Sequence, residues 1–447
     1  MSNVSLRILL SVYACEPGKG SEPGVGWRWA VEMALLGHNV CVLTRQNNRA
    51  AIERALQNVR LPGIEFIYYD LPSWARRWKR NGRGVHLYYL LWQIGAYHVA
   101  RRAHTALPFD AVQHLTFGVL RQPSLMGRLG IPFVAGPLGG GETAPLALRQ
   151  SFPLRSRFSE WLRDMGNRVC RHDPLVRSML RQANIVLCKT PESLAWIPAR
   201  YRAHSRCLLE IGVDVVANEK EPLFSVTVGD RPALRLVYVG RFLVWKGMDL
   251  GLRALAQLRE RGIDATLTMI GQGPAKDHWQ ALAAELDIDA AIDWVPWMEQ
   301  EKLMNAYASF DALLFPSLHD SSGNVVLESM ANGLPVVCLD LGGPAQIVNE
   351  ECGVVVGTRG LSIDQVVDSL ARSLEYLARW PAWRKALRKG ARRRAMQFEW
   401  RTVVGRVWSD DGVGTALVHA ARERSRLAAD PFADAAPCAR KARRNIT

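Results

Sequence analysis

The sequence predicts an α/β protein with two doubly wound domains, each built around a parallel sheet. Two parts of the chain show the same order of elements: an apolar strand, a glycine-containing loop, a helix-like segment and a second strand. The first of these strands covers residues 6–12 and its counterpart covers 234–240. Strands that alternate with helical patterns are typical of βαβ units and parallel sheets. A chain of 447 residues is also too long for one ordinary core, so two or three domains are expected.

Further strands are predicted from short apolar runs in both halves of the chain. In the first half these runs are 40–43, 109–113, 132–135 and 185–188, and in the second they are 265–271, 292–294, 312–315, 335–338 and 353–356. Glycine and proline punctuate the region between Ile211 and Pro232, so the domain boundary is placed there. The predicted division is a first domain over 1–215, a second over 216–380, arginine-rich helices over 381–410 and a basic tail over 411–447, disordered from Asp430.

Positive charge is concentrated in two parts of the chain. The net charge is +15, and the segment from Pro381 to Thr447 alone holds 16 Lys and Arg against 6 Asp and Glu. A second basic stretch runs from Arg149 to Arg181. Nucleic acid, anionic lipid head groups or anionic small substrates would each complement such charge, and a solvated face is the plain alternative. No helix-turn-helix, zinc finger or aromatic RNA-binding signature is present, so no nucleic acid is expected as a partner, although a nucleic-acid-binding protein stays open as an alternative.

The sequence favours a cytoplasmic protein. Its eight cysteines form no C-x-x-C pair, and we interpret them as reduced thiols. The amino-terminal apolar run is too short for a signal peptide, and the run from Leu87 to Ala100 is too short to span a bilayer. The aromatic and basic stretch from Trp74 to Arg80 is typical of a surface that contacts a membrane or of an insert that packs on its own domain.

The most informative stretch runs from Leu313 to Met330. An apolar strand ends at Pro316, a loop of small polar residues follows, and a helix-like segment then carries Glu328 in its first turns. Asp320 lies in the loop. Backbone N–H groups at a helix start bind phosphate or sugar oxygens, and a carboxylate nearby can accept hydrogen bonds from both hydroxyls of a ribose. The stretch therefore predicts a site for a sugar nucleotide.

Other candidate residues follow predicted strands, where the crevice of a doubly wound domain lies. Arg241 and Lys246 follow a strand that ends at Gly240, and two cations there would neutralise a departing diphosphate. A run of glycines from Gly18 to Gly26 fits neither the Walker pattern nor a G-x-G-x-x-G fingerprint. Exposed cations and plain structural loops are the respective alternatives.

The sequence offers three further candidates for a site. His114 follows the predicted strand 109–113, and a lone histidine is more often structural than catalytic unless its position favours function. A second glycine cluster runs from Gly136 to Glu142 after another strand, and its alternative is a wide turn. Asp287 and Asp289 form a D-x-D pattern in a loop between a helix and a strand, and we discount it as a metal site.

Together these motifs resemble the family-4 retaining glycosyltransferases of GT-B architecture, over roughly Leu6 to Trp408. The segment from Val239 to Gly247 is similar to the diphosphate loop of that family. The segment from Ile270 to Pro274 is similar to its next glycine turn, and Asp320 to Glu328 is similar to its E-x7-E signature. The first half resembles a bacterial branch found with surface-polysaccharide genes.

The resemblance implies two Rossmann-like domains facing a central cleft, with a C-terminal helix that crosses back to the first domain. The first domain would bind the acceptor and the second the nucleotide sugar. The implied catalytic residues are His114, Arg241, Lys246 and Asp320. The implied donor-binding residues are Gly240, Gly271, Gly323, Asn324, Val325 and Glu328, of which Glu328 would hold the ribose. The implied acceptor-side loops contain Gly24, Gly26, Gly139 and Gly140.

The implied activity is transfer of a hexosyl unit from a nucleoside-diphosphate sugar to a hydroxyl, with retention at the anomeric carbon. No cofactor and no metal are expected, since the two cations would take the role of a metal. The acceptor would be lipid-linked or a glycan, and the basic surfaces predict peripheral contact with an anionic membrane at the inner face of the inner membrane. Because Asp320 stands where the family has Glu, an inactive GT-B scaffold is one alternative, and an NAD-dependent Rossmann enzyme is disfavoured because no full fingerprint is present.

Overall fold

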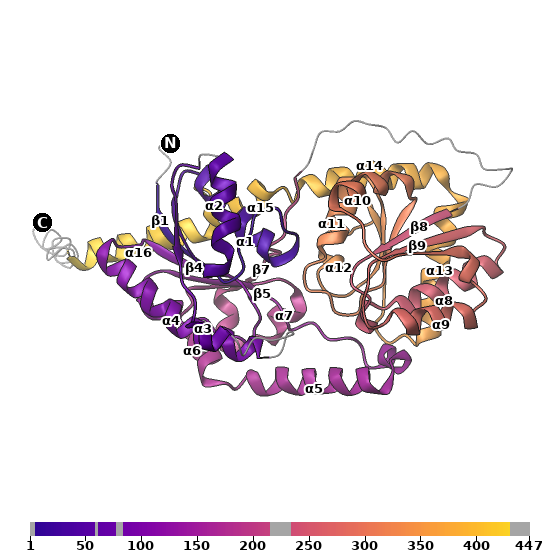
Figure 1. The fold of residues 1–447 in the computed structure, drawn as a ribbon, viewed down its shortest axis with the longest axis horizontal. Helices are drawn as coiled ribbons and strands as arrows, with labels where there is room; N and C mark the ends of the chain where they lie inside the picture. The colour runs from indigo at the N-terminus through magenta and orange to yellow at the C-terminus, as the bar shows by residue number, and fades with distance from the viewer. Residues whose placement is uncertain (1–4, 59–60, 77–83, 215–233, 430–447) are drawn as a thin grey trace, which may run out of the picture.

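The structure is a computed structural model that describes residues 5–58, 61–76, 84–214 and 234–429. It contains two parallel sheets in two domains that lie side by side (Figure 1), which confirms the predicted fold class. The first sheet has the order β3-β2-β1-β4-β5-β6-β7. Its strands are β1 (Arg7–Val12), β2 (Asn39–Thr44), β3 (Ile64–Tyr68), β4 (Ala111–Thr116), β5 (Phe133–Leu138), β6 (Ile185–Cys188) and β7 (Ser205–Cys207).

The second sheet repeats this arrangement with the order β10-β9-β8-β11-β12-β13. Its strands are β8 (Leu234–Val239), β9 (Ala265–Ile270), β10 (Ile292–Val295), β11 (Ala312–Phe315), β12 (Val336–Leu339) and β13 (Gly353–Val356). Every predicted strand is found. Strands β3 and β7 were not predicted, because they are half-buried or short edge strands that lack a strong apolar run.

Helices cover both faces of each sheet, as expected of doubly wound domains. In the first domain they are α1 (Ser21–Leu35), α2 (Arg49–Asn58), α3 (Ser73–Arg76), α4 (Val85–Ala106), α5 (Leu154–Cys170), α6 (Pro174–Gln182) and α7 (Pro191–Trp196). In the second they are α8 (Met248–Glu260), α9 (Lys276–Glu285), α10 (Gln300–Ala306), α11 (Asn324–Ala331), α12 (Pro344–Ile347) and α13 (Ile363–Arg379). The C-terminal helices are α14 (Pro381–Met396), α15 (Trp400–Trp408) and α16 (Val413–Ala429).

The side chains of β1 show how the first sheet is packed on both faces. Ile8 and Leu10 lie in the same cluster as Trp29 of α1, whereas Leu9 lies in the cluster of Trp92 from α4. All of them are fully buried. A strand that is apolar on both faces is what a parallel sheet between two helical layers requires.

The C-terminal helices cross back to the first domain, as the resemblance implied. Helix α14 packs against α11 of the second domain, whereas α15 packs against α1 of the first. Trp408 at the end of α15 donates a hydrogen bond from Nε1 to Oε1 of Gln113 on β4, 2.6 Å away. This buried contact fixes the end of the chain to the first sheet.

The region after Asp410 differs from the prediction in part. Residues 413–429, predicted as a basic tail, form helix α16, which packs against α15 and forms an ion pair between Arg422 and Asp110. Alanine and arginine have high helix propensity, and contact with α15 adds packing. Residues from Asp430 onward lie outside the described part, and so do 215–233, so the predicted domain boundary stays a prediction. Within the described residues, no helix is long and apolar enough to cross a bilayer.

The order of the strands places a crevice in each domain. Strands β1 and β4 are neighbours in the first sheet, and β8 and β11 are neighbours in the second. At each of these pairs the strand order reverses direction across the sheet. Ligands of doubly wound domains bind at such points, beyond the carboxyl ends of the strands. A ligand site is therefore expected at the four loops that follow these strands.

Candidate active site

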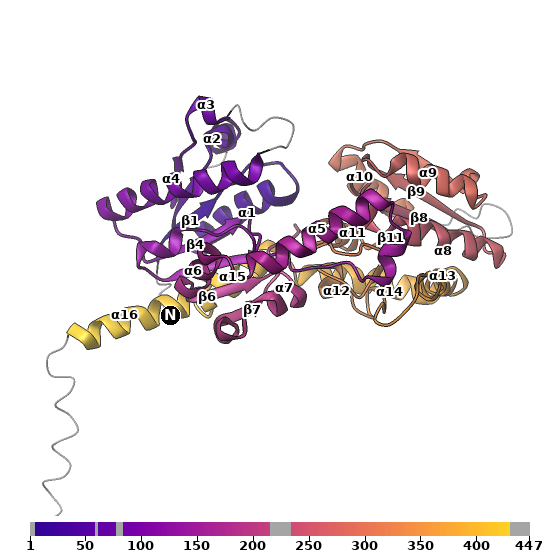
Figure 2. The same cartoon turned by 90° about the horizontal axis from the view of Figure 1, so that it is seen from below.

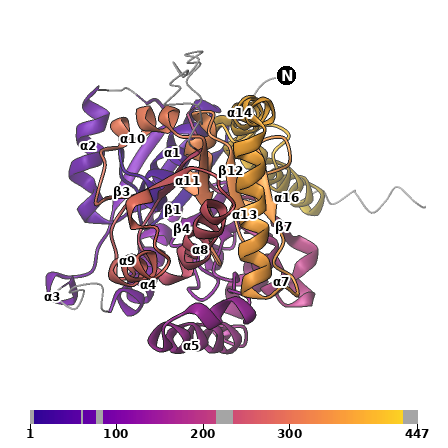
Figure 3. The ribbon, with the colours of Figure 1, turned by 90° about the vertical axis from the view of Figure 1, so that its right-hand side faces the viewer.

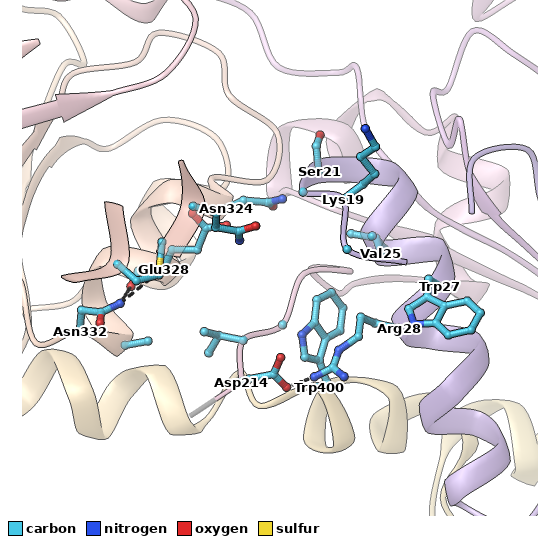
Figure 4. A pocket seen from close by; sticks show the side chains of 18 of the residues that line it. Lys19, Ser21, Val25, Trp27, Arg28, Asp214, Asn324, Glu328, Asn332 and Trp400 are labelled. Atoms are coloured by element: carbon cyan, nitrogen blue, oxygen red, sulfur yellow. Dashed lines mark hydrogen bonds and ion pairs between the residues drawn. The ribbon is translucent and has the colours of Figure 1, made fainter. Parts of the chain in front are cut away.

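A cleft of about 630 Å³ lies between the two domains (Figure 4). Its first-domain side is formed by the loop after β1 and the start of α1, and its second-domain side by α10 and α11. The polar side chains that line it are Lys19, Ser21, Arg28, Asp214, Gln300, Asn305, Asn324, Glu328, Asn332 and Arg392. The cleft is large enough for a sugar nucleotide and offers both charged and neutral partners.

Glu328 is a predicted site residue that lines this cleft and whose carboxyl has a raised pKa. Helix α11 begins after Gly323, whose φ of +84° is a conformation that glycine adopts readily. Glu328 lies one turn into the helix, and burial raises the pKa of its carboxyl to about 7. Oδ1 of Asn324, at the start of the same helix, is buried and has no hydrogen-bond partner among the residues that the structure describes. These polar atoms are prepared for a ligand with hydroxyl or amide hydrogens.

Lys246 and Asp320 form an ion pair at the switch point of the second sheet. Lys246 follows β8, Asp320 follows β11, and both side chains are mostly buried. The ammonium of Lys246 also lies over two aromatic rings, 4.7 Å from the centroid of Trp245 and 5.0 Å from that of Phe315. The structure thus brings together two residues that are 74 positions apart in the sequence.

A glycine makes the approach of these two loops possible. A Cβ atom at Gly247 would lie 2.0 Å from the carbonyl oxygen of Pro316, and its φ is +72°. Any other residue would push the Lys246 loop away from the Asp320 loop. The glycine turns after β8 and β9 also touch, because a Cβ at Gly271 would lie 2.0 Å from the oxygen of Gly240.

Two donor-side candidates, Arg241 and Val325, are exposed or half-buried. Arg241 is exposed, forms no ion pair within the described residues, and does not line the cleft. Its carbonyl oxygen accepts a hydrogen bond from Oη of Tyr238, 3.1 Å away, which holds the backbone but leaves the guanidinium unrestrained. Val325 is half-buried in the first turn of α11.

His114 lies inside a strand, which differs from the sequence prediction of a residue just after one. Strand β4 continues to Thr116, and His114 has no exposed surface. Its ring nitrogens lie 2.8 Å from Oη of Tyr89 and 3.3 Å from Oγ of Ser11. Burial lowers the pKa of His114 to about 4, so the ring is neutral at pH 7. Polar residues continue the strand here because they find partners within the domain.

Gly24 and Gly26 lie in helix α1 rather than in the loop that the sequence predicted, because α1 begins at Ser21. Gly24 lines the cleft, and a Cβ there would lie 2.0 Å from the oxygen of Lys19. Gly26 faces the domain interior, where a Cβ would lie 2.2 Å from the oxygen of Ala14. Both glycines therefore allow the preceding loop to fold back closely on the helix.

The second glycine cluster contacts the loop of Asp320. A Cβ at Gly139 would lie 3.1 Å from Cβ of Ser321, so this first-domain loop abuts the donor loop. Gly140 has a φ of +97° and donates its N–H to Oε2 of Glu142, 2.7 Å away. The Glu142 carboxylate also accepts hydrogen bonds from Thr190 and Ser193. The cluster is thus held rigidly at the domain interface.

Several cleft residues were missed as individual candidates by sequence reasoning. Arg28 forms an ion pair with Asp214, and its guanidinium lies 5.7 Å from the ring centroid of Trp400 (Figure 4). Lys19 lines the cleft from the loop after β1. Lys19 lies within a glycine run that was recognised, but nothing in the sequence pairs Arg28 with residues so far along the chain.

A buried ion pair lies next to the interface between the domains. Nζ of Lys189 lies 2.6 Å from Oε1 of Glu210, and both side chains are almost fully buried. The same carboxylate accepts a hydrogen bond from Oγ of Ser322 in the second domain, 2.7 Å away. This network ties the first domain to the residue two positions after Asp320.

Part of the chain, including most of the second domain, is similar to known proteins. Residues 225–394 match the glycosyl transferases group 1 family. The match contains both loops at the switch point, together with Lys246, Asp320 and Glu328. D-inositol 3-phosphate glycosyltransferase of Saccharomonospora viridis is 34% identical to the chain over 179 residues, which cover 38% of this chain and 40% of that protein. This chain thus spans about two fifths of the length of that curated relative.

Solved structures match nearly the whole chain at low identity. Sucrose-phosphate synthase from Thermosynechococcus elongatus has a TM-score of 0.61 and 17% identity, with 95% of this chain and all of that chain covered. HepE from Anabaena, solved in complex with UDP and glucose, has a TM-score of 0.53 and 15% identity, with 90% of this chain and 98% of that chain covered. These likenesses confirm the two-domain GT-B fold.

Proposed function

We propose that the protein transfers a hexosyl unit from a nucleoside-diphosphate sugar to a hydroxyl acceptor, with retention at the anomeric carbon. The observation that carries the proposal is Glu328, a half-buried residue that lines a cleft between two Rossmann-like domains and forms no ion pair within the described residues. A carboxylate in that setting gains hydrogen bonds when ribose hydroxyls arrive. The match of residues 225–394 to the group 1 family supports this reading.

Lys246 and Arg241 would neutralise the diphosphate of the donor. Lys246 lies at the end of the loop after β8 and forms an ion pair with Asp320. A diphosphate would share or take over that cation. Asp320 would then accept a hydrogen bond from the sugar. Arg241 is exposed and free to swing toward the second phosphate, so its contact would form only on binding.

The proposed reaction breaks the bond between the anomeric carbon and the diphosphate oxygen and forms a bond from that carbon to the acceptor oxygen on the same face. The acceptor proton passes to the departing diphosphate. Charge develops on the leaving group as the first bond breaks, and the ammonium of Lys246 would stabilise it. The two cations supply the positive charge in this proposal, so no metal ion is assigned a role.

The acceptor would bind on the first-domain side of the cleft. Lys19 and Arg28 line that side, and they favour an acceptor that carries negative charge. A lipid-linked diphosphate glycan, as in polysaccharide or glycolipid assembly, has this property. An inositol phosphate has it too, and the name of the relative from Saccharomonospora viridis makes it the second candidate acceptor. We place the protein in the cytoplasm, attached peripherally to the inner face of the inner membrane.

A thermal-shift and turnover experiment tests the proposal. A panel of UDP, GDP and ADP with their glucose conjugates would be added first, because a ligand that binds only the folded state raises its melting temperature. UDP and UDP-glucose are the first choices, since HepE binds UDP and glucose. Nucleotide release would then be measured with each acceptor class. If no nucleotide shifts melting while DNA does, a nucleic-acid-binding protein is favoured. If nucleotides bind without release, the protein is an inactive scaffold.

A further inference from the structure

Helix α5 carries a row of large apolar side chains that face away from the protein. Six residues are exposed by between 38% and 78% of their surface: Leu154, Phe158, Trp161, Leu162, Met165 and Val169. In Figures 1 and 3, α5 lies along the lower edge of the molecule, outside both sheets. Figure 2, which views the molecule from that side, shows α5 in front of the region between the two domains. Such a contiguous apolar surface marks an interaction site.

The helix is amphipathic with its polar face turned inward. At 3.6 residues per turn, the six apolar residues fall within an arc of about 100°. The buried residues of the helix are Glu160 and Asn167, which lie on the opposite side. A surface helix of a globular protein normally buries its apolar face, so this orientation is the reverse of the usual one.

Specific contacts hold the helix in this orientation. Oε1 of Glu160 lies 3.2 Å from Nε2 of His319 in the second domain, and Oδ2 of Asp164 lies 2.6 Å from Nη1 of Arg149. The carbonyl oxygen of Asn167 accepts a hydrogen bond from the indole of Trp196. Turning the apolar face inward would break all of these contacts and bury charged groups without partners, which is costly. The apolar face must therefore be covered by something outside the domain.

The charges around the apolar face are of one sign. Arg155, Arg157 and Arg168 are exposed and lie at its two edges, whereas the acids of the helix, Glu160 and Asp164, are on the inward side. The stretch from residue 149 to 181 contains eight arginines and three acids, a net charge of +5. An apolar stripe bordered by arginines is typical of helices that lie in the interface of an anionic bilayer.

We propose that α5 docks the protein on an anionic phospholipid surface, with the row from Leu154 to Val169 inserted among the lipids. A second copy of the chain is a poorer occupant, because a symmetric pairing would place the arginines of one α5 near those of the other. The sequence predicts a membrane-contacting surface at the stretch from Trp74 to Arg80, of which only Trp74 to Arg76 lies within the described residues. All residues of helix α5 lie within the described part of the chain.

The docking role of α5 rests on the membrane attachment in the proposed function and names the surface responsible for it. Its test measures vesicle binding and not sugar transfer. Flotation would be compared between vesicles that contain phosphatidylglycerol and vesicles of phosphatidylcholine alone. The test variant is Phe158→Glu with Trp161→Glu. The matched control is Tyr376→Glu with Trp380→Glu, at two aromatic residues of similar exposure (58% and 59%) beside the start of α14, which lies at the opposite edge in Figure 1.

The expected result is that the wild type and the control float with anionic vesicles, while floating of the test variant falls at least about tenfold, because two carboxylates would enter the apolar layer. The triple variant Arg155→Glu, Arg157→Glu and Arg168→Glu should lose the preference for anionic lipid. If the test variant floats like the wild type, α5 is not the docking surface. If the wild type does not float, the membrane attachment itself is wrong. A lipid-free wild-type dimer that the test variant makes monomeric would overturn the proposal in favour of self-association.

Discussion

The second sheet has the same strand order as the first six strands of the other sheet, yet the loops at the two switch points carry different chemistry. After β8 and β11, charged side chains meet in an ion pair of Lys246 and Asp320, and Glu328 follows one helical turn into α11. At the equivalent strands β1 and β4, glycines let the chain fold closely on α1, and His114 is enclosed within the sheet. The same topology thus places an ion pair at the switch point of one domain and closely packed glycines at the switch point of the other. Topology places a site, but the side chains at the strand ends decide its chemistry.

The largest effect is expected from Lys246, because its ammonium is held beside Asp320 at the switch point, whereas Arg241 on the same loop is exposed. Lys246→Ala should lower kcat by about a thousandfold, close to 4 kcal/mol, if it stabilises the leaving diphosphate. Steady-state kinetics with a saturating donor would measure this, with Lys385→Ala on the exposed face of α14 as the control. The double variant with Arg241→Ala should lose still more. Turnover near that of the wild type would show that Lys246 does not stabilise the leaving diphosphate.

Glu328 should govern donor binding more than turnover. Glu328→Ala is expected to raise the donor KM at least tenfold, about 1.4 kcal/mol, because the ribose hydroxyls lose their acceptor. An unchanged donor KM would show that the carboxylate does not hold the ribose. Glu299→Ala, at an exposed acid just before α10, is the control.

The raised pKa of Glu328 also predicts a pH dependence. Because the folded-state pKa is about 7 and the unfolded value is 4.5, the stability from this group is fully present below the unfolded value and is lost as pH rises through 7. Donor binding needs the ionised form, so donor affinity should rise with pH up to about 7 and then level off. Calorimetric Kd values across this range would show it. Glu328→Gln should bind weakly with a flat pH profile.

His114 is expected to act on stability in a way that the second-domain residues do not. His114→Ala leaves the hydroxyls of Tyr89 and Ser11 without their buried partner and should cost about 1–3 kcal/mol of unfolding free energy. Because burial lowers its pKa from 6.5 to about 4, its stabilising contribution is present above the unfolded value and is lost as pH falls toward 4. Denaturant unfolding would measure both effects. A loss of kcat without loss of stability would instead return His114 to the catalytic role that the family resemblance implies.

The smallest expected effect is that of a chelator. If Arg241 and Lys246 supply the positive charge at the diphosphate, EDTA should leave the initial rate of nucleotide release unchanged. The rate would be measured in the same buffer with added Mg²⁺ or Mn²⁺ as a comparison. A rate that falls with EDTA and returns with a divalent cation would show that the lysine and arginine do not suffice.

The sequence predicted the second domain more fully than the first. Asp320, Asn324 and Glu328 lie in one continuous strand–loop–helix stretch, so their local pattern predicts their placement. Lys246 is 74 residues away from Asp320, but both follow strands, and the parallel sheet brings strand ends together. The sequence predicted a strand over 109–113 with His114 just after it, and only the structure shows that β4 continues through His114 to Thr116.

Other features depend on information that the sequence pattern does not carry. The ion pair of Arg28 and Asp214 joins residues from opposite ends of the first domain. Helix α5 is visibly amphipathic in sequence, but hydrophobic periodicity predicts an inward apolar face, and only contacts such as Glu160 with His319 reveal the reverse. Residues 413–429 were predicted to belong to a basic tail from their alanine- and arginine-rich composition, whereas in the structure they form a helix that packs on α15.

The position of α5 along the chain makes it separable from the rest of the domain. It is inserted in the connection from β5 to β6, and α6 alone packs Val176, Met179 and Leu180 onto the sheet to complete that crossover. A chain that lacks 154–170 would keep the path of both neighbouring strands. The proposed lipid docking and the proposed sugar transfer would thus depend on different segments, and over evolutionary time one could be gained, lost or exchanged while the other is retained.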